Sequence, residues 1–140
     1  MLRIHHLFAG HNPSMSITLS EDIISQRLRA AIQGDPASDG FSEIELTEET
    51  SLKAAAVLIP LVWQDEEWHL LYTRRTDTVE SHKGQVSFPG GASDEGETSP
   101  EQTALREAEE EIGLDPGNVR VLGRLSNLIT ITYFRVTPVV

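Results

Sequence analysis

The sequence marks both ends of one helix, between Ser99 and Gly113. Ser99 is a typical N-cap residue, Pro100 suits the first helical position, and Gln102 follows the cap by three residues, as in a capping box. Gly113 stands where helices commonly end, because glycine adopts the left-handed backbone conformation at little cost. We therefore expect a helix over residues 100–112, against which the rest of the fold has to pack.

The two sides of this helix differ in chemistry. At about 100° per residue, one narrow stripe is apolar and should face the core; it consists of Leu105, Ala108 and Ile112. Glu107, Glu110 and Glu111 fall together on the opposite side, where their spacing makes the side chains neighbours. Clustered carboxylates suit a hard divalent cation such as Mg²⁺ or Mn²⁺. A run of acidic residues by itself is more often only a solvated helix face.

Periodicity predicts the other elements. A second helix should begin after Ser20 and end before Gly34. Strand patterns occupy residues 54–63, 68–75, 85–89, 119–125 and 132–140. The first two segments should pair as a hairpin, and the polar residues 37–51 should form a loop. This mixture predicts an α/β or α+β sandwich with a mixed sheet.

Length and composition limit the classes of function. A chain of 140 residues suits one domain, which we place at residues 18–140 after an irregular arm at 1–17. The net charge of -11 argues against nucleic acid and membrane surfaces as partners, since both are anionic. The absence of cysteine excludes disulfides, thiolate catalysis and cysteine metal sites. The apolar run at 54–63 is too short to span a bilayer, and we expect a cytoplasmic protein.

Residues 91–114 resemble the Nudix box, a pattern of glycine, a spaced acidic residue, Arg-Glu, and a Glu-Glu pair before glycine. Its positions here are Gly91, Glu97, Arg106, Glu107, Glu110, Glu111 and Gly113. A second signature upstream resembles that of coenzyme A pyrophosphatase-like members; it comprises Leu70, Leu71, Thr73, Arg75, His82 and the run "GQVSFPGG" at 84–91. The resemblance implies a Nudix-type α/β/α sandwich with a mixed β-sheet. Family members usually continue past the position of Val140, so truncation of the C-terminal part relative to the family stays open.

The same resemblance implies a metal-dependent hydrolase. Its substrate would be coenzyme A or a derivative, and its products 3′,5′-ADP and 4′-phosphopantetheine or the acyl form. Glu107, Glu110 and Glu111 would hold Mg²⁺ or Mn²⁺, and Glu110 or Glu111 could instead help deprotonate the attacking water. Arg106 completes the expected catalytic set; it should pair with Glu97 and brace the loop against the helix.

A further group of residues is implied in substrate binding: Arg75, His82, Gln85, Ser87, Gly90 and Gly91. The two glycines should let the backbone turn sharply and approach the metals or phosphates. Glu80 stands where the subfamily often has a base, which leaves open another nucleoside diphosphate derivative, such as ADP-ribose, a nucleotide sugar or a dinucleotide. A catalytically weak nucleotide-binding module is a third reading. Members of the family often dimerise, so a homodimer also stays open.

Overall fold

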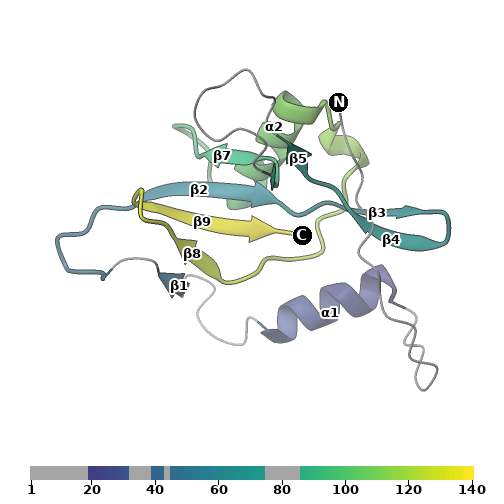
Figure 1. Cartoon of the computed structure of the whole chain (residues 1–140), viewed down its shortest axis with the longest axis horizontal. Helices are drawn as coiled ribbons and strands as arrows, with labels where there is room; N and C mark the ends of the chain where they lie inside the picture. The colour runs from purple at the N-terminus through teal and green to yellow at the C-terminus, as the bar shows by residue number, and fades with distance from the viewer. Residues whose placement is uncertain (1–18, 32–38, 43–44, 75–85) are drawn as a thin grey trace.

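The computed structural model describes residues 19–31, 39–42, 45–74 and 86–140 (Figure 1). In chain order its elements are α1 (Glu21–Ala31), β1 (Asp39–Ser42), β2 (Lys53–Leu58), β3 (Leu61–Gln64), β4 (Glu67–Leu70), β5 (Thr73–Arg74), β6 (Val86–Ser87), β7 (Gly90–Ala92), α2 (Pro100–Ile112), the short 3₁₀ helix η1 (Pro116–Asn118), β8 (Asn127–Ile129) and β9 (Phe134–Val139). The expected arm at 1–17 lies outside the described residues. No helix in the described ranges has the length and apolar character needed to cross a membrane.

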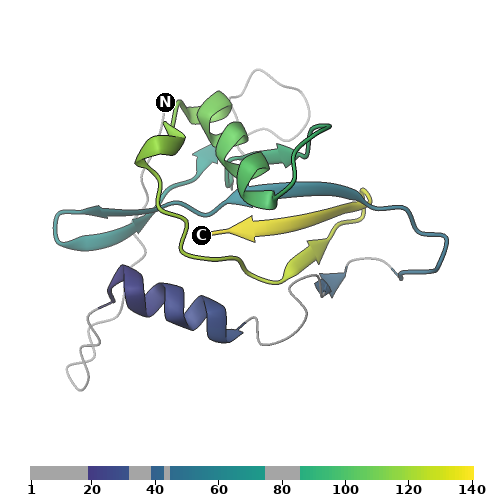
Figure 2. The same cartoon turned by 180° about the vertical axis from the view of Figure 1, so that it is seen from behind.

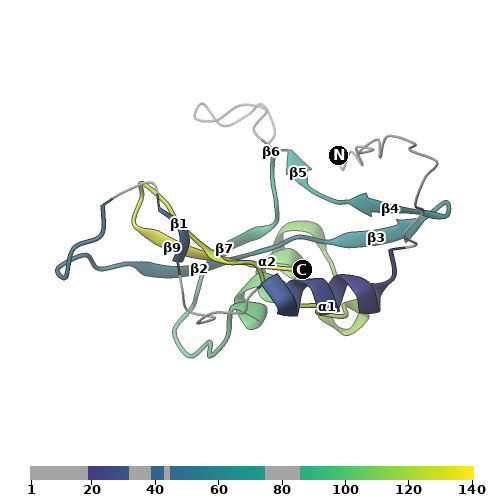
Figure 3. The ribbon, with the colours of Figure 1, turned by 90° about the horizontal axis from the view of Figure 1, so that it is seen from below.

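Five strands form a mixed sheet in the order β1-β8-β9-β2-β7. β2 pairs in parallel with β9 and antiparallel with β7. β8 pairs antiparallel with β9 and in parallel with β1. The two remaining pairs, β3–β4 and β5–β6, stand apart from this sheet (Figure 3). The predicted mixed sheet is therefore confirmed.

Helix α2 lies across one face of the sheet (Figure 2). The core between helix and sheet consists of Ala56, Leu58, Ala104, Ala108 and Val139. Alanines on both α2 and β2 let the two backbones approach closely, since no longer side chain separates them. Leu105 and Ile112 pack against this core, so the apolar stripe predicted from the sequence faces the sheet.

The ends of α2 match the sequence prediction. The Ser99 side chain accepts a hydrogen bond from the Gln102 backbone N–H, and Gly113 has a left-handed φ of 68°. The capping box differs in one contact, because Gln102 Oε1 accepts from the backbone N–H of Thr98 at 2.7 Å. The two hydrogen bonds, one to the Ser99 side chain and one from the Thr98 backbone, thus hold the first turn of α2. The position of this turn fixes the direction in which the acidic residues of the helix point.

Two predicted strands are each divided in the structure. Residues 54–63 form β2 and β3, because Pro60 lies between them and has no backbone N–H to donate. Residues 68–75 likewise contribute to β4 and β5. The predicted hairpin exists between β3 and β4, with Asp65 and Glu66 at positive φ in its two-residue turn.

The strand predicted at 119–125 is wrong. This segment is extended, but its regular pairing is limited to one bridge between Arg124 and Val139. The Leu125 N–H donates to the Pro138 carbonyl at 2.9 Å, and proline cannot return that hydrogen bond. The ladder therefore stops after one bridge.

The loop predicted at 37–51 is also wrong in part, because β1 lies within it. β1 pairs with β8, a strand of three residues that the sequence analysis did not identify. Neither segment is long enough to show a period. Long-range pairing creates both strands.

Helix α1 forms as predicted over its described residues, and its expected end near Gly34 lies outside them. Ser25 and Leu28 are its buried residues. The Ser25 hydroxyl donates to the Leu122 carbonyl at 2.9 Å, so α1 is bonded to the extended segment beside β9.

Candidate active site

Gly90 and Gly91 lie in strand β7 and not in a turn. Gly91 pairs with Ala56 and Gly90 with Val57 of β2, so the predicted sharp turn at these glycines is wrong. Their missing side chains serve close approach instead. A Cβ on Gly90 would lie 2.3 Å from the Ala56 carbonyl oxygen, and a Cβ on Gly91 would lie 2.5 Å from Glu107 Oε1. β7 therefore brings bare backbone against β2 and against the acidic side of α2.

Arg106 lies at the centre of the acidic group. Its Nε donates to Glu97 Oε1 at 2.9 Å, and its Nη1 donates to Glu107 Oε1 at 2.9 Å. The same Nη1 is 3.4 Å from Glu110 Oε2, and Nη2 donates to the Ala92 carbonyl at 3.0 Å. The structure thus brings Arg106 and Glu97 together, in the contact expected for a brace between loop and helix.

These contacts shift the ionisation of both partners. The pKa of Glu97 falls from 4.5 to about 2, first because Arg106 donates to it, and then because Thr103 and the Asp94 backbone N–H donate too. The hydrogen bond to Glu97 also raises the pKa of Arg106 above its ordinary value. The pair is therefore fully charged at neutral pH.

Two hydroxyls support this pair, and sequence reasoning missed both. Thr103 is fully buried, and its Oγ1 lies 2.7 Å from Glu97 Oε2 and 3.0 Å from Ser93 Oγ. Thr103 precedes Arg106 by three residues, so the two side chains are neighbours on the helix. The sequence signal that could have identified Thr103 is a polar residue three positions before Arg106 on the same helix.

The three glutamates occupy different environments. The Glu107 side chain is 17% exposed beside Gly91, whereas that of Glu110 is 61% exposed. Glu111 Oε2 accepts from the Gly90 backbone N–H at 3.3 Å. Glu107 and Glu111 therefore face β7, and Glu110 reaches towards solvent.

Four carboxylates contact the single guanidinium of Arg106; they belong to Asp94, Glu97, Glu107 and Glu110. One positive charge leaves an excess of negative charge, which favours a cation nearby. Within the described ranges, no three acidic or histidine side chains are already arranged to hold a metal ion. The carboxylate donors fit a hard divalent cation in their chemistry.

Four other residues are expected in substrate binding, and one of them, Ser87, lies within the described residues. Ser87 lies in β6, where its carbonyl accepts from the Thr73 hydroxyl at 3.1 Å. Arg75, His82 and Gln85 lie outside the described residues, as does Glu80.

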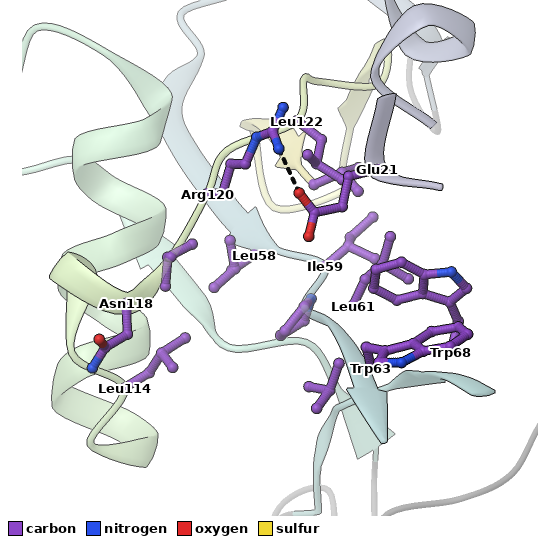
Figure 4. A pocket seen from close by; sticks show the side chains of 14 residues that line it. Glu21, Leu58, Ile59, Leu61, Trp63, Trp68, Leu114, Asn118, Arg120 and Leu122 are labelled. Atoms are coloured by element: carbon purple, nitrogen blue, oxygen red, sulfur yellow. Dashed lines mark hydrogen bonds and ion pairs between the residues drawn. The ribbon is translucent and has the colours of Figure 1, made fainter. Parts of the chain in front are cut away.

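A separate cavity of about 370 Å³ lies between the end of α2, the β3–β4 hairpin and the start of α1 (Figure 4). Trp63 and Trp68 meet edge to face at one end of it, with ring centroids 5.0 Å apart. Glu21 and Arg120 form an ion pair at 2.6 Å along its wall. Its walls come from segments far apart in the chain, which is why sequence reasoning missed it. Glu107, Glu110 and Glu111 do not line this cavity.

The mixed sheet carries a capped helix on which Arg106 pairs with Glu97 while Glu107 and Glu111 face the glycines of β7, and this agrees with the resemblance of residues 91–114 to the Nudix family. The chain belongs to that family, since the family model described as "NUDIX domain" matches residues 52–138. The predicted fold class, a Nudix-type α/β fold with a mixed sheet, is confirmed.

Its relatives carry the same family name. Two proteins named "Uncharacterized Nudix hydrolase NudL" are similar to it. The one from Pectobacterium atrosepticum is 49% identical over 88 residues, covering 63% of this chain and 45% of that protein. The one from Yersinia enterocolitica is 51% identical over 86 residues, covering 61% and 44%. The chain thus spans less than half the length of these curated relatives.

A solved structure is also similar, the Nudix hydrolase RenU from M. smegmatis. It matches with a TM-score of 0.51 and 27% identity, over 62% of this chain and 58% of that one. The likeness supports the same family.

Proposed function

We propose that this Nudix domain is a divalent-metal-dependent hydrolase that cleaves the diphosphate bond of coenzyme A or its derivatives. The observation that supports hydrolysis is the acidic group of α2, where Glu107 and Glu110 contact Arg106 and Glu111 faces Gly90. The relatives named Nudix hydrolases support the same reaction class. The choice of coenzyme A rests on the resemblance of residues 70–91 to the coenzyme A pyrophosphatase-like signature.

Glu107, Glu110 and Glu111 are the proposed ligands of Mg²⁺ or Mn²⁺. A bound cation would neutralise phosphate oxygens and lower the pKa of an attacking water. The Glu110 side chain is 61% exposed, so it can turn to a cation or to water at small cost. Glu110 or Glu111 is the proposed general base.

Arg106 is not a proposed ligand. It holds Glu97 of the loop and Glu107 of the helix at once, and it donates to the Ala92 carbonyl beside β7. This geometry keeps the acidic side of α2 against the glycine strand. Substrate contacts are proposed for Arg75, His82, Gln85 and Ser87, with Gly90 and Gly91 giving the phosphates close access to the backbone. The small-molecule substrate, a homodimer and the cytoplasmic location remain predictions.

A panel of substrates tests the proposal. The protein is incubated with coenzyme A, ADP-ribose or a dinucleoside polyphosphate, each with Mg²⁺ or Mn²⁺, and the products are separated by chromatography. Preferred release of 3′,5′-ADP from coenzyme A supports the proposed substrate. Preference for either other compound assigns the hydrolase to another nucleoside diphosphate derivative. Binding with no turnover of any compound indicates a nucleotide-binding module.

A matched pair of variants tests the ligand set. Glu110→Gln keeps the size of the side chain but removes the charge, and we expect it to abolish turnover while the fold persists. Glu109→Gln makes the same change at the neighbouring position of α2, outside the acidic group, and should retain turnover. Full activity in Glu110→Gln would show that the ligand assignment is wrong.

A further inference from the structure

Thr103 is the fully buried polar side chain of α2. A buried hydroxyl is costly unless it is hydrogen-bonded, and this one has two partners on the preceding loop. Its Oγ1 lies 2.7 Å from Glu97 Oε2 and 3.0 Å from Ser93 Oγ. The residue thus joins the helix interior to the loop that carries Glu97.

The direction of these hydrogen bonds follows from the chemistry of the groups. A threonine hydroxyl has one proton, and an ionised carboxylate can only accept. The proton of Thr103 therefore goes mainly to Glu97 Oε2 at 2.7 Å, the charged and closer acceptor, and Ser93 Oγ at 3.0 Å is its second acceptor. The Ser93 backbone N–H donates to the Ala54 carbonyl of β2 at 2.9 Å, which ties this network to the central sheet.

The result is a Glu97 carboxylate with both oxygens held. Oε2 accepts from Thr103 and from the Asp94 backbone N–H at 2.8 Å, and Oε1 accepts from Arg106 Nε at 2.9 Å. Three hydrogen bonds restrain the rotation of this carboxylate, which in turn restrains the guanidinium that donates to it. Nη1 of Arg106 then points at Glu107.

We propose that Thr103 is a positioning residue, whose hydroxyl fixes Glu97 and through it the orientation of Arg106 beside the acidic side of α2. It touches neither metal nor substrate. Its effect on turnover rests on the proposed hydrolase function, whereas its effect on Arg106 does not.

Two substitutions separate the hydroxyl from packing. Thr103→Val has nearly the same shape and no hydroxyl, whereas Thr103→Ser keeps the hydroxyl and loses a methyl group. The first readout is the ¹H–¹⁵N signal of the Arg106 Nε–H in the whole chain. We expect this signal to be protected from solvent exchange in the wild type and in Thr103→Ser, and to shift and exchange rapidly in Thr103→Val.

The second readout is steady-state kinetics with the substrate that the panel identifies. Loss of a group that orients metal ligands typically lowers metal affinity or activity about 10–100-fold. We expect kcat of Thr103→Val to fall within that range with KM nearly unchanged, and Thr103→Ser to stay within about threefold of wild type.

Each outcome either supports or overturns the positioning role of Thr103. An Arg106 signal in Thr103→Val identical to wild type overturns the proposal, and so does an equal loss in Thr103→Ser, which would assign the effect to packing. If Thr103→Val does not fold, the same measurement on Thr103→Ala, which cannot overfill the core, replaces it. If even the wild type hydrolyses nothing, the hydrolase proposal fails, and the Arg106 signal still tests the positioning role.

Discussion

Substitution by alanine should have different consequences at the two glycines of β7, Gly90 and Gly91. At Gly91, the new Cβ would lie 2.5–2.8 Å from the three carboxylate atoms of Glu107. These atoms end a flexible side chain, which can retreat by the roughly 0.5 Å that relieves the closest contact. At Gly90, the new Cβ would lie 2.3 Å from the Ala56 carbonyl oxygen and 2.6 Å from Val57 Cα. Those are backbone atoms of β2, which lies between β9 and β7, and they cannot move away without breaking the sheet.

We therefore expect Gly91→Ala to fold with a free energy of unfolding within about 1 kcal/mol of wild type, since glycine-to-alanine changes also restrict the unfolded chain. Its Glu107 carboxylate is displaced, and a misplacement of about 1 Å can cost about 100-fold in rate. Gly90→Ala should lose about 1–3 kcal/mol, which is typical of overpacking.

Urea denaturation followed by tryptophan fluorescence measures the stability of both variants. Mn²⁺ titration and the hydrolysis assay measure the acidic group. The reasoning is refuted if Gly91→Ala is destabilised as much as Gly90→Ala, or if Gly91→Ala binds Mn²⁺ and turns over substrate as wild type does.

Two further predictions concern the ion pairs of α2. The pKa of Glu97 is about 2 in the folded protein, below its ordinary value of 4.5, so its contribution to stability is complete above the higher value and lost as the pH falls towards the lower. Urea midpoints between pH 5 and 2 should consequently fall more steeply for wild type than for Glu97→Gln; parallel curves would contradict this. The half-buried ion pair between Glu101 and Arg124 joins the first turn of α2 to the segment beside β9 and lowers the pKa of Glu101. Arg124→Gln should cost about 1 kcal/mol in thermal unfolding, and a variant as stable as wild type would show that the pair contributes nothing.

The sequence predicts an element well where its signals are local. Helix α2 begins and ends where Ser99 and Gly113 indicate, because caps act on backbone groups within one turn. The β3–β4 hairpin follows from two short apolar runs around a polar turn. Segment 119–125 alternates between apolar and polar residues, as a strand would. It does not form one, because Pro138 on the partner strand β9 cannot continue the ladder of hydrogen bonds. The alternating pattern of residues 119–125 does not reveal which residues they would pair with.

The candidate site likewise has one part that follows from the sequence and another that follows from the tertiary structure. The sequence by itself determined that Glu107, Glu110 and Glu111 share one side of a helix, because a helical repeat places residues three and four apart together. Only the tertiary structure decided what they face. The pairing of β7 with β2 puts Gly91 against Glu107 and Gly90 against Glu111, whereas Glu110 reaches towards solvent. The folding of the loop beneath α2 puts Thr103 on Glu97, since burial leaves that hydroxyl no water to bond.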